Sequence, residues 1–218
     1  MDLDLLYNRL QECFEVEDWW PSESAFEVMV GAILTQQTNW DSVEKSLNEL
    51  RRRGLLEPDK LAYADIDLLE KSIRPCGFYR QKAERIRELA LHIQLEYEGM
   101  PELLLNKEIE SARAELLSLK GVGKETADSI LLFAGKRSKF VAAAYVLRIL
   151  ERTGLLDSTD YDEVQQYVES RFSNDPVELG RLYALFIQLA KTYCRPDPRC
   201  VECPLEWECS TGLAQGKK

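Results

Sequence analysis

The sequence predicts an all-α protein. Apolar residues recur at helical spacing almost throughout the 218-residue chain, as three stretches illustrate: Phe26, Met29, Val30 and Ile33; Ile86, Leu89, Ala90 and Ile93; Leu182, Leu185, Phe186 and Leu189. Residues that cap or end helices fall between such stretches. No alternation of apolar and polar residues is long enough to indicate a sheet, so we expect about ten helices joined by short loops.

Local signals predict where several of these helices begin and end. Asn39 can cap a helix from Trp40 to about Arg53. The sequence Gly99-Met100-Pro101 closes a long helix that begins near Tyr79. Two more helices are predicted on either side of a glycine-containing turn, over Glu110–Ser118 and Thr126–Phe133.

The composition is that of a globular chain with an acidic balance. Hydrophobic residues make up 45% and charged residues 30%, which suits one or two compact domains, and the net charge is −10. An acidic chain argues against a polyanionic partner. Two segments are nevertheless locally basic, with five Lys or Arg residues each, Arg74–Arg87 and Lys120–Lys139. They predict either a basic face on an acidic body or ordinary solvated helix faces.

Four cysteines near the C-terminus have the spacing C-x5-C-x2-C-x5-C: Cys194, Cys200, Cys203 and Cys209. Thiolates this close can reach one centre, and the centres that accept four sulfurs are an iron–sulfur cube and tetrahedral zinc. Zinc modules usually pair two C-x2-C sequences, so we favour a [4Fe–4S] cluster. Two disulfides are the alternative, disfavoured because no secretory segment opens the chain. Cys13 and Cys76 are expected to be buried free thiols.

The segment Leu119–Ala127 (LKGVGKETA) joins two of the predicted helices. Gly121 and Gly123 predict a tight turn that exposes backbone N–H groups beside a helix N-terminus, which is an anion site, and Lys124 is expected to contact a phosphate. A plain helix–helix turn is the alternative. With its flanking residues the segment resembles a helix-hairpin-helix, which grips the DNA backbone without reading sequence.

The hairpin, the four cysteines and the helical pattern together resemble the endonuclease III superfamily of DNA glycosylases over nearly the whole chain. The segment ILTQQT ending at Thr38 resembles the helix end whose glutamine, here Gln36, enters the DNA stack. The segment GFYRQKA resembles the wedge loop, which implies that Phe78 intercalates and that Arg80 and Lys82 bind DNA. An apolar wedge replaces the stacking that is lost when a base is flipped out.

Segments around the tryptophans resemble one branch of that superfamily, 3-methyladenine DNA glycosylase III. These segments are WWP at 19–21, LTQQTNW at 34–40, RPCGFYRQKA at 74–83 and GVGKETAD at 121–128. Two aromatic residues of that branch sandwich the damaged base, which implies this role for Trp19 and Trp40, with Trp20 beside them. N-alkylated purines are cationic, and indole faces attract cations. The alternative is that these tryptophans belong to the core.

Two catalytic positions depart from the superfamily pattern. Endonuclease III has a lysine that forms a Schiff base with the sugar, and Glu125 stands at that position, which implies no lyase activity. Superfamily members carry an aspartate that stabilises the sugar cation or activates water, and Ala143 stands there. Either an aspartate was replaced by alanine, which we favour, or the natural protein lacks this acid.

The resemblance implies a monomeric, monofunctional DNA glycosylase of base excision repair that hydrolyses the N-glycosidic bond of N-alkylated bases such as 3-methyladenine in double-stranded DNA. We expect two helical lobes, residues 22–135 ending in the hairpin, and residues 1–21 plus 136–218 carrying the cluster. Localisation is expected to be cytoplasmic, with the nucleoid in a prokaryote. The alternatives are a glycosylase for mispaired thymine or uracil or for oxidised bases, and a catalytically silent damage-binding protein.

Overall fold

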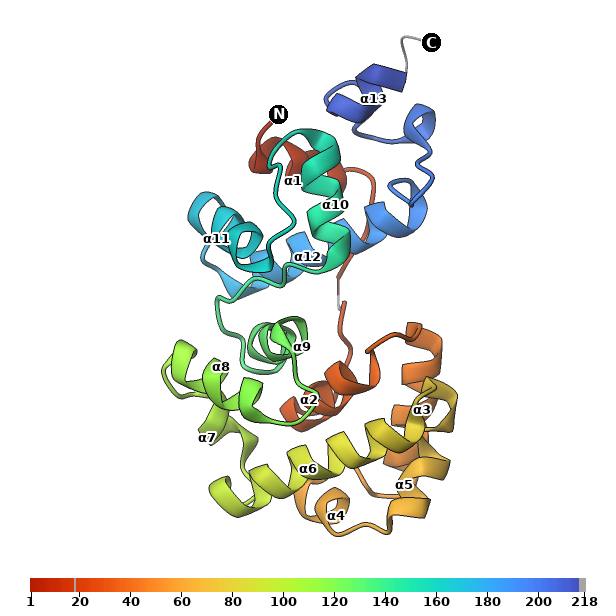
Figure 1. Ribbon diagram of the computed structural model, residues 1–218, viewed down its shortest axis with the longest axis vertical. Helices are drawn as coiled ribbons and strands as arrows, with labels where there is room; N and C mark the ends of the chain where they lie inside the picture. Colours follow the sequence, from red (N-terminus) through yellow and green to blue (C-terminus); the bar gives the residue numbers. More distant parts are fainter. Residues whose placement is uncertain (18, 216–218) are drawn as a thin grey trace. The chain divides into compact units, whose positions relative to one another are not determined.

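The protein is all-α, as the sequence predicts. The computed structural model describes residues 1–17 and 19–215, without the side chain of Gln215, and there are no strands in this part of the chain. The helices form two compact units (Figure 1). We call Trp20–Arg137 the hairpin unit, and Met1–Trp19 with Ser138–Lys218 the cysteine unit. No helix in the described ranges combines the length and hydrophobicity needed to cross a membrane.

The hairpin unit holds the predicted helices of the first half of the chain. Its segments are α2 (Ala25–Leu34), α3 (Trp40–Arg52), α4 (Pro58–Ala62), α5 (Ile66–Ser72), η1 (Arg74–Cys76), α6 (Tyr79–Tyr97), α7 (Pro101–Leu105), α8 (Ile109–Ser118), α9 (Lys124–Ser129) and the π-helical turn η2 (Ile130–Ala134). Asn39 caps α3 through Ser42 N–H, and α6 ends before the left-handed residues Glu98 and Gly99. Both predicted boundaries are confirmed.

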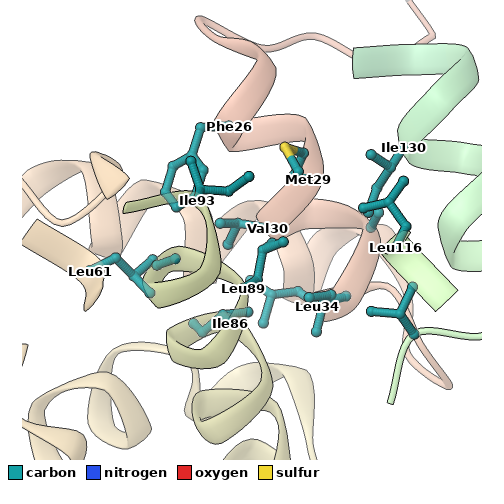
Figure 2. Packing of buried hydrophobic residues seen from close by; sticks show 14 of the residues in the cluster. Phe26, Met29, Val30, Leu34, Leu61, Ile86, Leu89, Ile93, Leu116 and Ile130 are labelled. Carbon is teal, nitrogen blue, oxygen red and sulfur yellow. The ribbon is translucent and has the colours of Figure 1, made fainter. Parts of the chain in front are cut away.

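Helix α2 runs through the middle of the hairpin-unit core. All of its residues after Ala25 are buried. Figure 2 shows α2 side chains meeting those of α4, α6, α8 and η2 in one apolar cluster, with these members labelled: Phe26, Met29, Val30, Leu34, Leu61, Ile86, Leu89, Ile93, Leu116 and Ile130. Because α2 is enclosed up to its last residue, the chain leaves the core only after Leu34. The turn that follows therefore starts from a fixed point.

The cysteine unit combines an N-terminal helix with the C-terminal part of the chain. Its segments are α1 (Leu3–Gln11), α10 (Ala144–Thr153), α11 (Tyr161–Arg171), α12 (Pro176–Thr192), η3 (Cys200–Glu202) and α13 (Ser210–Gln215). Helix α12 packs against both α1 and α10. The sequence expectation for the two remaining cysteines is half right, because Cys76 is buried and Cys13 is exposed. Cys13 follows the last turn of α1, where its side chain meets solvent.

Candidate nucleic-acid interface

The predicted hairpin is present, with α8 and α9 joined by a turn at residues 119–123. Gly121 has φ +79°, a left-handed conformation that glycine adopts without strain. A Cβ there would also lie 2.2 Å from Nε of Arg85, so this position requires glycine. Gly123 is the N-cap of α9, and a Cβ there would meet nothing within 4 Å. The turn therefore has an open approach at Gly123, beside the first N–H groups of α9.

A buried ion pair holds the two hairpin helices together. Arg113 on α8 donates from Nε and Nη2 to the two carboxylate oxygens of Asp128 on α9, at 2.6 and 3.0 Å. Asp128 is fully buried. A bidentate arginine–carboxylate contact fixes orientation as well as distance. The hairpin angle is thus set by side chains and does not depend on the turn alone.

The structure corrects the expectation for Gln36. Its Nε2 donates to the Gly121 carbonyl and to Oγ1 of Thr126, at 2.9 and 3.0 Å, and its Oε1 accepts from Arg85 at 2.6 Å. The half-buried Gln36 side chain thus joins the turn after α2 to the hairpin and is not available to enter a duplex. The next residue, Gln37, is exposed and has φ +53°. Gln37 is the side chain that this turn presents to solvent.

The predicted wedge residue is exposed, and one of the predicted cations is buried. Phe78 is 62% exposed, with φ +45°, at the start of α6. Arg80 is also exposed, and its Nε lies 3.8 Å from the Glu70 carboxylate. Lys82, in contrast, is only 2% exposed, and its Nζ donates to the carbonyls of Leu34 and Cys76. Lys82 cannot reach a phosphate, so its assignment to the DNA-binding residues is wrong.

Of the three candidate tryptophans, two lie together in the hairpin unit. The rings of Trp20 and Trp40 meet edge to face at 5.5 Å, and Trp20 also contacts Phe133 at 5.1 Å. The Trp20 indole rests against Gly31 of α2, where a Cβ would lie 3.4 Å away. Both rings are half-buried and pack against the core. Trp19 belongs to the cysteine unit, where Nζ of Lys191 lies 5.8 Å from its ring.

Position 143 is the start of a helix. Ala143 is the N-cap of α10, where its carbonyl accepts from Val146 N–H at 2.8 Å and its methyl group caps nothing. The residue is 1% exposed. Helix α11 holds the preceding segment, because the Glu169 carboxylate accepts from Phe140 N–H and the Gln165 amide donates to the Phe140 carbonyl. The backbone at position 143 is therefore well fixed, although its side chain carries no chemical group.

Glu125 lies in the first turn of α9. Its residue surface is open to solvent, yet protein surrounds the carboxyl group closely enough that desolvation raises its pKa above the usual value. Lys124, one residue earlier, is exposed. A carboxylate repels a phosphate and an ammonium attracts one, so Lys124 is the better phosphate ligand of the two.

The four C-terminal cysteines line one cavity of the cysteine unit. From α10, Arg148 donates to the Cys194 carbonyl at 2.9 Å, and Nη1 of Arg152 lies 3.6 Å from the Cys194 sulfur. Burial raises the pKa of Cys203 to about 11, and the other three thiols add to the shift. A positive centre is needed to keep four such thiolates together. Within the described residues, no three His, Cys, Asp or Glu side chains are arranged around a single metal ion.

Comparison with known proteins identifies the family. The sequence pattern of the HhH-GPD superfamily of base excision DNA repair proteins matches residues 30–174. A Methanocaldococcus jannaschii protein named as a candidate DNA repair glycosylase is 40% identical over 206 residues, 94% of each chain. This chain belongs to the HhH-GPD superfamily. As an HhH-GPD protein it falls in the class of base excision repair DNA glycosylases, which act on DNA.

Relatives of this HhH-GPD chain include two kinds of glycosylase. Endonuclease III of Thermotoga maritima is 29% identical over 193 residues, covering 88% of this chain and 85% of the relative. The solved structure of a Helicobacter pylori 3-methyladenine DNA glycosylase bound to 1,N6-ethenoadenine is 27% identical, with a TM-score of 0.78, covering 88% of this chain and 98% of that one. The superfamily resemblance and the predicted fold class are therefore confirmed.

Sequence reasoning missed two features of this HhH-GPD chain, the exposure of Gln37 and the burial of Lys82. A signal for Gln37 existed, because the apolar stripe of α2 continues in a three-residue step from Ile33 to Gln36. That step turns Gln36 inward and leaves Gln37 outside. The burial of Lys82 had no comparable signal, since its two acceptors come from other segments of the chain.

Proposed function

We propose that this protein is a monofunctional DNA glycosylase that releases N-alkylated purines. The observation that carries the proposal is the Trp20–Trp40 pair, whose half-buried rings meet edge to face at 5.5 Å. An indole held in place by a neighbouring ring is a rigid surface for a flipped base, and its π face attracts a cationic one. The likeness to a 3-methyladenine glycosylase of known structure supports the same base class. The sequence resemblance also makes Trp19 a proposed base-stacking residue.

The proposed reaction is hydrolysis without strand cleavage. A lyase needs an amine that forms a Schiff base with the sugar, and the position of that amine in endonuclease III carries Glu125. A carboxyl group cannot form a Schiff base, so Glu125 does not provide the lyase nucleophile. The attacking species is then water, which an aspartate carboxylate at position 143 would activate and which Ala143 cannot.

The proposed DNA contacts come from three exposed parts of the hairpin unit. The open N–H groups at Gly123 and the neighbouring Lys124 bind phosphate. Phe78 enters the duplex as an apolar wedge, and Gln37, rather than Gln36, enters beside it. Arg80, next to Phe78, contacts the backbone of the same segment. These contacts do not read sequence, which suits an enzyme that must find one damaged base anywhere.

The proposed cofactor is a [4Fe–4S] cluster on Cys194, Cys200, Cys203 and Cys209. Support comes from the shared cavity that these four cysteines line and from the likeness to endonuclease III relatives. Four sulfurs around one zinc must all lie about 2.3 Å from it, whereas a cube accepts a wider set. When bound, the cluster would pin the C-terminal loop to α10, and it takes no part in the glycosidic step.

A second candidate function follows from Ala143. A methyl group at the position of the superfamily aspartate neither activates water nor stabilises a sugar cation. A natural alanine there would leave a protein that binds damage without cutting. A glycosylase for mispaired or oxidised bases is the remaining alternative, supported by the endonuclease III relative.

Binding to a panel of duplexes tests the base class. The chain with Ala143 is used unchanged, so that turnover does not remove the ligand. Duplexes contain 1,N6-ethenoadenine, a G·T mispair, 8-oxoguanine or no lesion, and fluorescence anisotropy reports affinity. We expect the ethenoadenine duplex to bind about tenfold more tightly than undamaged DNA, from stacking alone. Preference for the G·T or 8-oxoguanine duplex would overturn the assignment.

A further inference from the structure

The buried ammonium of Lys82 makes two hydrogen bonds that have no part in the proposed reaction. Lys82 lies in the first turns of α6, and its Nζ donates to the Leu34 carbonyl at 2.9 Å and to the Cys76 carbonyl at 2.8 Å. A buried ammonium is unfavourable unless it is paired or hydrogen-bonded. A methionine of similar length would fill the same space without that penalty. The two hydrogen bonds therefore call for an explanation beyond packing.

Both acceptors of Lys82 are carbonyls at the ends of helical segments. Leu34 is the last residue of α2, and Cys76 is the last residue of η1. Carbonyls in the last turn of a helix lack an intrahelical donor and carry partial negative charge. One ammonium thus caps two helix ends, and these two ends lie in segments more than forty residues apart in sequence.

An exposed residue in a left-handed conformation follows each of these helix ends. Gln37 has φ +53° three residues after Leu34, and Phe78 has φ +45° two residues after Cys76. A bulky residue in this region is strained, and it stays there only where the surrounding structure fixes it. Lys82 also donates its own backbone N–H to the Phe78 carbonyl at 3.0 Å, so it holds the wedge segment on both sides of Phe78.

We propose that Lys82 is a positioning residue that holds Gln37 and Phe78 as a matched pair for insertion into the duplex. The inference rests on the proposed function, in which these two side chains fill the space around a flipped base. The Gln36 contacts extend the same frame to the hairpin, because Gln36 joins the turn after α2 to Gly121. The phosphate-binding turn and the two inserting tips are then one rigid set, and phosphate contact places both tips at once.

Base unstacking separates this role from simple support of the fold. A duplex carries 2-aminopurine next to the lesion, and its emission rises when the neighbouring base leaves the stack. The chain with Ala143 is compared with Lys82→Met, which keeps the apolar stem and loses the donors. Lys45→Met on α3 is the matched control, because it removes one exposed lysine charge from the same unit. All emissions are read at saturating protein, so that affinity does not enter.

We expect Lys82→Met to reduce the emission gain about fivefold, while Lys45→Met leaves it unchanged. Affinity for undamaged duplex and its salt dependence should stay within about twofold for both variants, because the phosphate contacts lie in the hairpin. Full emission gain in folded Lys82→Met would overturn the inference. If Lys82→Met does not fold, Lys82→Gln takes its place, since its amide keeps donors but cannot reach both carbonyls, and the same loss is expected.

Phe78→Ala distinguishes a failed inference from a failed proposed function. A loss of emission in Phe78→Ala, with none in Lys82→Met, would leave the wedge in place and remove only the role of Lys82. Unchanged emission in Phe78→Ala would remove the wedge itself, and with it the reason to position it. In the double variant we expect a further loss smaller than that of Lys82→Met alone, because without Phe78 the side chain of Lys82 acts only through Gln37.

Discussion

Position 143 shows how much a single side chain decides in this protein. Hydrogen bonds to the backbone of Phe140 and to the Ala143 carbonyl hold the chain here at the start of α10, and the Ala143 side chain is enclosed. An aspartate there would have two roles, as the acid of the reaction and as the cap of a helix that has no side-chain cap. Ala143 removes both, so the two losses can be measured separately.

The missing side-chain cap of α10 predicts how Ala143→Asp changes the stability of the protein. An aspartate N-cap accepts from the N–H groups of the first helical turn, which alanine cannot do, and the gain is about 1 kcal/mol. Thermal melting should therefore show a higher Tm for Ala143→Asp than for the parent chain. Ala143→Ser, which caps without a charge, is the control and should gain a similar amount. A lower Tm in both variants would mean that position 143 has no room for a cap.

Glu125 gives a pH-dependent prediction. Desolvation raises its pKa above 4.5, so the folded protein binds this proton more readily than the unfolded chain. Stability is then lost as pH rises from about 4.5 through the folded-state pKa. Glu125→Gln should raise Tm at about pH 7 and change it little at about pH 4. The exposed Glu96→Gln on α6 is the control, and an equal gain from it at neutral pH would contradict the explanation.

At the scale of elements, the two glycines of the hairpin turn have different proposed roles. Gly121 allows the backbone conformation of the turn, and Gly123 leaves the approach to a phosphate open. Gly121→Ala forces alanine into φ +79° against Arg85, which should lower stability by at least about 1–2 kcal/mol. Gly123→Ala meets open space and should lower stability by only about 0.5–1 kcal/mol. Both should weaken duplex binding, because the new methyl group of Gly123→Ala stands where a phosphate would approach.

Melting curves and anisotropy titrations at several salt concentrations check the two glycine variants. The weakening should be equal for damaged and undamaged duplex, since the hairpin does not read bases. Tight binding by both variants at moderate salt would show that this turn does not hold DNA.

The helices themselves were predictable because their signals are local. The cap at Asn39 and the glycines of the hairpin act within a few residues, and the apolar spacing of α2 and α6 is visible in sequence. The choice between Gln36 and Gln37 was only partly predictable. The apolar stripe of α2 turns Gln36 inward, but the contacts that hold it come from Gly121 and Arg85 in distant segments. The prediction that Lys82 binds DNA was wrong for the same reason. Lysine side chains are usually solvated, and the carbonyls that bury this one belong to other segments of the chain.

At the scale of the whole molecule, the net charge does not decide whether the proposed binding surface can attract DNA. The chain has a net charge of −10, yet its proposed partner is a polyanion. Binding then depends on local contacts from the hairpin and from exposed cations such as Arg80. Affinity should fall steeply with salt, because each phosphate contact releases counterions.

The four cysteines predict the metal content of the whole protein. Anaerobically purified protein should be brown, with about four iron atoms per chain and broad absorbance near roughly 400 nm. Cys203→Ser should lower the iron content, because Cys203 lines the cavity. Cys13→Ser should leave the iron content unchanged, because Cys13 is exposed and does not line that cavity. Stoichiometric zinc in place of iron would exclude the cluster.

Release of free base from methylated duplex by Ala143→Asp tests whether this protein is a monofunctional glycosylase for N-alkylated purines. We expect Ala143→Asp to release 3-methyladenine and to leave the strand intact, and the Ala143 chain to be slower by about 10²–10⁴. A Trp40→Leu form of the same variant, folded by its melting curve, should release this cationic base more slowly. Preferred release of thymine from G·T or of 8-oxoguanine, strand cleavage, or no release by Ala143→Asp would contradict this function.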